Sequence, residues 1–108
     1  MDAAERLRRY CINDRRLFGE DDRPMAESLD ARTDALVHLA ALVAARAPGA
    51  SFHVAVDDAV AAGASLGEIV AVLDATRSIA GLPRVVGAAQ QIAAALGFDE
   101  EFVPQAER

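Results

Sequence analysis

Alanine is the feature that most constrains this chain, because it makes up about a quarter of the 108 residues, well above its ordinary share. Alanine has the strongest intrinsic preference for the α-helix, and its small side chain lets neighbouring helices pack closely. Only 5% of the residues are aromatic, so the core buries little area per residue. We therefore expect an all-α single domain, a helical bundle that gains further burial by assembling as a homo-oligomer.

Glycine and proline divide the apolar pattern into about five helical segments. The valines keep helical rather than alternating spacing, so no strand is predicted. The expected organisation is an N-terminal helical arm and linker over residues 1–28, a helical core over 29–97 and an acidic tail over 98–108. The core helices are expected from Leu29-Asp30 to the Pro48-Gly49 break, over 51–62, over 66–80, and from Gly81-Leu82-Pro83 to Gly97.

Polar residues at the segment starts predict helix caps. Asp30 is the expected N-cap of the second helix and Ser51 of the third. Ser65 and Glu68 have the spacing of a capping box. The second helix is apolar on nearly all sides, which places it centrally or at a subunit interface. The third has a predicted buried stripe of Phe52, Ala55, Val56, Ala59 and Val60.

The net charge of -6, concentrated after residue 50, argues against nucleic acid as a partner. No apolar run approaches the roughly 20 residues that cross a bilayer, so no membrane span is expected. Cys11 is the single cysteine, which excludes an internal disulfide framework. With no signal-peptide pattern at residues 1–6, the cytoplasm is the expected compartment.

Two histidines are candidates for proton transfer. His53 and Asp57 are spaced i, i+4, so the carboxylate can orient the imidazole for moving a proton at a carbon next to a carbonyl; the alternative is a solvated surface pair. His38 follows Asp34 by one turn and is either a buried proton-transfer or interface residue, or a core or interface histidine satisfied by one hydrogen bond. Two histidines without a third ligand predict no metal site.

The candidate substrate-binding residues are His38, Ser51, Arg77 and Arg84. The two guanidinium groups are suited to holding a substrate carboxylate. The alternative for Arg77 is a surface ion pair with Asp74, and capping is a sufficient role for Ser51.

Four segments resemble the carboxymuconolactone decarboxylase family, which includes the alkylhydroperoxidase D-like proteins. They are LDARTDALVHLAAL at 29–42, AVAAGASLGEIVAVL at 59–73, AGLP at 80–83 and RRLFGED at 15–21. The resemblance spans residues 15–97 and rests on the order of the segments, since each alone is a generic helix pattern. It implies an all-α bundle that assembles as a trimer or hexamer.

The resemblance also implies positions for the family's chemistry. The C-x-x-C-x-x-x-H motif of the peroxidase branch falls on Pro48, Ser51 and Ala55, and the glutamate and histidine of the decarboxylase branch fall on Ser51 and Ala55. None of these groups is retained, which disfavours thiol peroxidase activity and leaves Cys11 without a partner thiol in its chain. His53, two residues from the expected histidine, is the nearest acid-base group, since this stretch is one residue longer than the decarboxylase pattern.

The function that these observations predict is that of a cofactor-free, lyase-like decarboxylase or isomerase acting on a small carboxylated or lactone substrate. His53 supplies the acid-base chemistry in this reading, and Asp57 orients it. The alternative is a non-catalytic oligomeric binding or structural member of the family, motivated by the missing catalytic groups.

Overall fold

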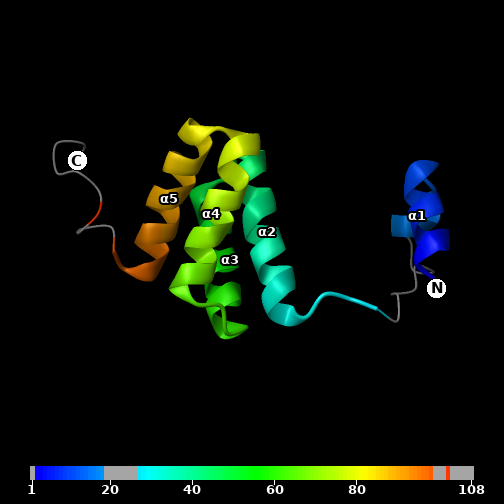
Figure 1. Ribbon diagram of the computed structural model, residues 1–108, viewed down its shortest axis with the longest axis horizontal. Coiled ribbons are helices and arrows are strands. Elements are labelled where there is room, and N and C mark those ends of the chain that lie inside the picture. The colour runs from blue at the N-terminus through cyan, green and yellow to red at the C-terminus, as the bar shows by residue number, and fades with distance from the viewer. Residues whose placement is uncertain (1, 19–26, 99–101, 103–108) are drawn as a thin grey trace.

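The computed structural model describes residues 2–18, 27–98 and 102. Its elements are α1 (Ala3–Cys11), the 3₁₀ turn η1 (Arg15–Phe18), α2 (Ala31–Ala45), α3 (Gly49–Ala61), α4 (Leu66–Ala80) and α5 (Leu82–Leu96). Helices α2 to α5 pack as a bundle (Figure 1). These described residues contain no strand, and the predicted all-α class is confirmed.

Residues 2–18 form a segment that we call the arm. Asp2 caps α1 by accepting a hydrogen bond from the Glu5 amide at 2.8 Å. Hydrogen bonds from Arg8 and Arg9 hold the pKa of Glu5 at about 2, and those from Arg16 do the same for Asp14. Among the described elements α1 contacts only η1, and α1 buries none of its residues.

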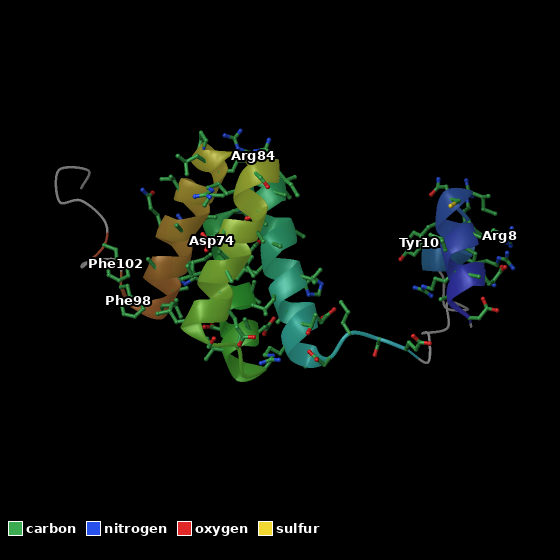
Figure 2. All side chains as sticks on the ribbon, in the orientation of Figure 1. Arg8, Tyr10, Asp74, Arg84, Phe98 and Phe102 are labelled. Carbon is green, nitrogen blue, oxygen red and sulfur yellow. The ribbon has the colours of Figure 1, made fainter. Side chains whose placement is uncertain are left out.

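The predicted linker and tail lie largely outside the described residues. Residues 19–26 of the linker and 99–101 and 103–108 of the tail are not described. In the tail, the rings of Phe98 and Phe102 stack with their centroids 5.0 Å apart, as Figure 2 lets the reader follow.

Helix α2 begins at the predicted cap but ends earlier than predicted. The Asp30 carboxylate accepts a hydrogen bond from the Thr33 amide at 2.7 Å. At the other end Arg46 adopts a left-handed conformation with φ 55°, and the Ala47 amide returns to the Leu42 carbonyl at 3.1 Å. This C-terminal motif closes the helix before Pro48, because residues preceding a proline disfavour the helical region.

Helix α3 begins one turn earlier than predicted. Pro48 is its N-cap residue, and no side chain caps it. The prediction that Ser51 caps this helix is wrong, because the Ser51 amide already donates to the Pro48 carbonyl at 3.0 Å inside the first turn. The predicted stripe is buried except for Val60, which is half exposed.

The other predicted helix boundaries are confirmed. The Ser65 hydroxyl accepts from the Glu68 amide at 3.1 Å, and the Glu68 carboxylate accepts from the Ser65 amide at 3.0 Å, which completes the capping box. Gly81 has φ 89° and joins α4 to α5, and Pro83 lies in the first turn of α5. Gly97 ends α5 in a left-handed conformation.

The core lies between four helices and consists of aliphatic side chains around one phenylalanine. Helix α2 contacts α3, α4 and α5, so its predicted central position is confirmed. The cluster of buried residues comprises Leu39, Val43, Phe52, Ala55, Val56, Ile69, Val85, Ala88 and Ile92. Within the described part of the chain, no helix is long and apolar enough to span a membrane.

The capping box predicts a specific pH dependence of stability. The hydrogen bond from the Ser65 amide lowers the pKa of Glu68 below its ordinary 4.5, and the charge of Arg32, whose guanidinium lies 3.3 Å from the carboxylate, adds to this. A depressed folded-state pKa stabilises the protein above the unfolded-state value, and this stabilisation is lost as the pH falls through the folded-state value.

We therefore expect Glu68→Gln to lower the free energy of unfolding near neutral pH, with the deficit shrinking below the ordinary pKa of 4.5. Urea denaturation of both proteins over a pH series measures this difference. Asp74→Asn, on the exposed side of the same helix, is the matched control. A Glu68→Gln deficit that stays constant over the series would contradict the assignment.

Candidate active site

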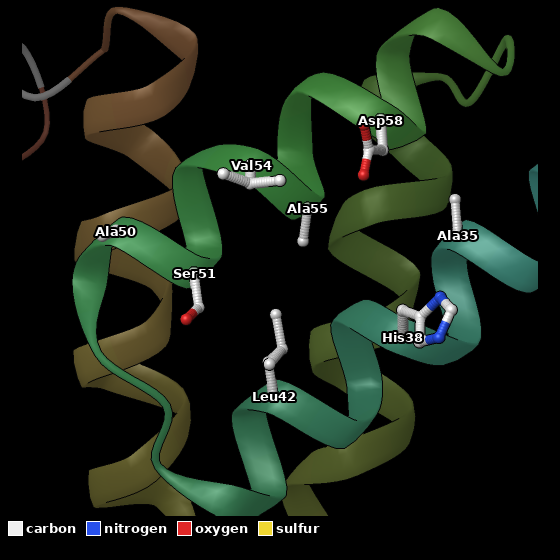
Figure 3. Close-up of a pocket in the computed structure, with 8 residues that line it drawn as sticks. All are labelled: Ala35, His38, Leu42, Ala50, Ser51, Val54, Ala55 and Asp58. Atoms are coloured by element: carbon white, nitrogen blue, oxygen red, sulfur yellow. The ribbon is translucent and has the colours of Figure 1, made fainter.

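A pocket of about 440 Å³ lies between α2 and α3 and has a largely apolar lining. Ala35, His38 and Leu42 line it from α2, and Ala50, Ser51, Val54, Ala55 and Asp58 line it from α3. In Figure 3, Leu42 and Ala55 point into the space between the two helices from opposite sides. The volume lies within the range of pockets that hold small organic ligands.

The lining residues on α3 share one helix face because of their spacing. Ser51, Ala55 and Asp58 follow one another at i, i+4 and i+7, which places them along one side of a helix. Asp58 is not among the residues singled out from the sequence, although this spacing from Ser51 is a signal that could have identified it. Three polar groups therefore border an otherwise apolar pocket: an imidazole, a hydroxyl and a carboxylate.

His38 brings a paired imidazole to the pocket. Its Nδ1 lies 3.5 Å from the Asp34 carboxylate one turn earlier on α2. The side chain of His38 is 72% exposed, so the interpretation of a buried or core histidine is wrong for this chain. The reason is geometric: α2 buries the face that carries Ala35, Leu39 and Val43, and His38 lies off that face, where solvent reaches the ring.

The structure places His53 and Asp57 elsewhere. Both are exposed on α3, and neither lines the pocket between α2 and α3. Their spacing puts them on one side of the helix, yet the described structure contains no hydrogen bond or ion pair between them. The i, i+4 pairing predicted for His53 and Asp57 is instead found in α2, between Asp34 and His38.

The two candidate arginines also lie away from this pocket. Arg77 is exposed on α4, and no ion pair joins it to Asp74 in the part of the chain that is described. Arg84 lies at one end of the bundle (Figure 2), where it lines a smaller pocket of about 190 Å³ together with Arg46. Its guanidinium donates to the Ala44 carbonyl at 2.6 Å, which satisfies the C-terminal end of α2.

Metal-binding side chains do not cluster in the described part of the fold. Over residues 2–18, 27–98 and 102, no group of three or more His, Cys, Asp or Glu side chains is arranged to hold a metal ion. Cys11 is an exposed free thiol on α1, an element that contacts none of the bundle helices.

The protein is an all-α helical bundle: a helical arm precedes a four-helix core, and an open pocket lies between the first two core helices. A model of the carboxymuconolactone decarboxylase family matches residues 15–95. This match covers most of the chain, and the protein belongs to that family. Neither a curated protein nor a solved structure matches it.

The resemblance to the family also points to this pocket. Ser51 and Ala55, the positions onto which the acid-base pair of the decarboxylase branch is carried, both line the pocket between α2 and α3. Neither position carries a titratable side chain. The titratable side chains that line this pocket are His38 on α2 and Asp58, one turn after Ala55 on α3.

Proposed function

We propose that this protein is a cofactor-free acid-base enzyme of the family that binds a small lactone or related carbonyl compound between α2 and α3. The observation that carries the proposal is the meeting of a paired histidine with the two family positions in one pocket. The apolar lining suits the carbon skeleton of such a substrate, and the polar groups suit its oxygen atoms.

His38 is the acid-base group that the geometry favours over His53. Asp34 faces Nδ1, which orients the ring and leaves Nε2 for the substrate. Histidine is the side chain most often used for general acid-base catalysis, and a positioned one contributes about 10²–10⁴-fold to rate. The assignment of the acid-base role to His53 and Asp57 remains a prediction from the sequence, and the exchange experiment compares it with the assignment to His38.

The charges around the pocket favour isomerisation of a neutral lactone over decarboxylation of a carboxylate. Asp58 lines the pocket, Asp34 pairs with His38, and none of the eight lining residues is an arginine. A substrate carboxylate is repelled by these acids, whereas a lactone carbonyl is not. Ser51 can donate a hydrogen bond to the lactone oxygen.

The proposed reaction is a proton shift between two carbons. His38 removes a proton from the carbon next to the lactone carbonyl, and the electron pair of that C–H bond moves into the conjugated system as an enolate. The protonated imidazole then returns the proton to a different carbon of that system. The product is an isomer of the substrate, and the histidine is restored.

Deuterium exchange tests this chemistry with simple butenolides as probes, whatever the natural substrate is. We expect the protein to accelerate proton-deuterium exchange at the carbon next to the carbonyl of β,γ-unsaturated butenolides in D₂O, followed by NMR. His38→Ala should reduce this acceleration by about 10²-fold or more. His53→Ala is the matched control, since it also removes an exposed imidazole from a core helix, and it should leave the exchange unchanged.

Two other outcomes separate the remaining assignments. Loss of exchange in His53→Ala but not in His38→Ala would assign the chemistry to His53 and Asp57. Butenolide binding without exchange in any variant would favour the non-catalytic binding role, which the absence of an acid-base side chain at Ser51 and Ala55 motivates.

Assembly as a homo-oligomer is part of the proposal. Large apolar side chains are exposed on α3, α4 and α5, among them Val60, Val70 and Val86. Burying such side chains between copies removes apolar area from water, which a small alanine-rich core cannot do within one chain. The resemblance to trimeric and hexameric members of the family points the same way.

A further inference from the structure

The arm contains a helix whose apolar side packs against none of the bundle helices in the described part of the chain. Leu7 and Tyr10, spaced i, i+3 on one side of α1, are 64% and 60% exposed. The arginines on its polar side are engaged with Glu5 by ion pairs of 2.8 and 3.3 Å. The Arg6 guanidinium lies over one face of the Tyr10 ring, 5.9 Å from its centroid, yet Leu7 and Tyr10 both stay more than half exposed.

Such a helix is not stable by itself. An isolated helix shorter than about 12–15 residues is marginal in water, because nucleation costs more than a few hydrogen bonds return. Helix α1 has 9 residues and buries none of them. Its amphipathic pattern is that of a helix that packs one side against another surface.

The groove between α2 and α3 offers a surface that complements the arm. It is open and mainly apolar, and Val54 on its edge is 62% exposed. Residues 2–18 carry five arginines against three acids, whereas described residues 27–98 carry seven acids against four arginines. The acids at the groove are Asp34 and Asp58, and Asp58 has no ion-pair partner among the described residues.

We propose that the arm of one copy docks across the mouth of the α2–α3 groove of a second copy. Leu7 and Tyr10 pack against Val54 and Leu42, and the net positive charge of the arm lies against the net negative charge of the bundle. A second copy is the occupant because α1 contacts no helix of its own bundle in this structure. An amphipathic helix laid into an apolar groove is a common mode of recognition. This inference does not depend on the proposed isomerase chemistry.

Docking across the mouth also closes the pocket from outside. The pocket is open to solvent in a single copy, and Asp58 and His38 both lie on its border (Figure 3). An arm that covers the pocket excludes water from it. The loss of water strengthens the electrostatic interactions of His38 and Asp58 inside the pocket. The site of each copy is then completed by a residue pair from its neighbour.

The single native cysteine makes the proposal testable in the full-length protein. Cys11 lies on α1 next to Tyr10 and is a free, exposed thiol. We introduce Val54→Cys at the groove and treat the protein with a short bis-maleimide cross-linker. Covalent dimers that join Cys11 of one chain to position 54 of another, identified by peptide mass spectrometry, are the expected product.

Three controls decide the outcome. Ile79→Cys places a thiol at an 85% exposed apolar position on α4, outside the groove, and should give several-fold less cross-linking to Cys11. Adding Leu7→Asp to Val54→Cys should reduce the dimer by a similar factor, with unchanged circular dichroism. The wild type reports any dimers that join Cys11 to Cys11.

Equal cross-linking at positions 54 and 79, or none at position 54, would overturn the proposal. Cross-links between Cys11 and position 54 confined to one chain would assign the groove to the arm of the same copy and would overturn docking between copies. A dominant Cys11 to Cys11 product would show that arms pair with each other instead.

Discussion

Leu39→Ala is expected to lower the free energy of unfolding by about 2–5 kcal/mol, the range for truncating a fully buried leucine. Leu39 has no exposed area and belongs to the cluster formed by α2, α3, α4 and α5. The substitution removes apolar contacts and leaves a cavity that the surrounding helices fill only in part. Small domains have total stabilities of about 5–15 kcal/mol, so a large share of the stability is lost.

Val37→Ala is the matched control for this substitution. Val37 lies two positions earlier on the same helix and is 51% exposed. Because it lies outside the core, we expect a change within about 1 kcal/mol, partly offset by the better helix propensity of alanine. Urea denaturation followed by far-UV circular dichroism measures both variants. Equal losses for the two would show that α2 is not packed as described.

Gly81→Ala should destabilise the protein by about 1–3 kcal/mol, because the backbone at this position suits only glycine. Gly81 combines φ 89° with ψ 151°, a region that residues with a Cβ atom essentially avoid. The position joins α4 to α5, and its conformation sets the direction in which α5 leaves the turn. A Cβ atom there meets only Pro83, at 3.9 Å, so the cost is one of backbone conformation rather than of crowding.

Gly87→Ala, inside helix α5, should have the opposite sign. Gly87 lies inside α5, and a Cβ atom there has nothing within 4 Å. Alanine loses less conformational entropy than glycine on entering a helix, so we expect a gain of about 0.5–1 kcal/mol. Thermal and urea denaturation of the two variants give the comparison. Stabilisation by Gly81→Ala would contradict the backbone described for the α4–α5 turn.

Local chemistry made much of this fold predictable. Asp30, the Ser65 and Glu68 capping box and the glycines at 81 and 97 act over three or four residues, a distance at which the sequence alone names both partners. The start of α3 was predicted wrongly at Ser51 for the same kind of reason. A serine near a helix start is a good cap, but here the Pro48 carbonyl already accepts the Ser51 amide at 3.0 Å.

The candidate site was predictable only in outline. The family positions Ser51 and Ala55 do line a pocket, so the location on α3 could be obtained from the resemblance. The sequence analysis favoured His53 and Asp57 over His38, because His53 is only two residues from Ala55, the position onto which the resemblance carries the family's histidine. Which histidine borders the pocket depends on how α2 and α3 face each other, and no spacing within one helix contains that information.

The sequence by itself determined the helices, most of their caps and the family, because these depend on local propensity, on side chains a few residues apart and on the order of segments. Only the tertiary structure decided which faces of α2 and α3 meet, which residues border the groove between them, and that the arm contacts no helix of its own bundle. The physical reason is that packing joins residues distant in sequence, so the presence of His38, Ser51 and Asp58 at one pocket follows from helix orientation rather than from either helix alone.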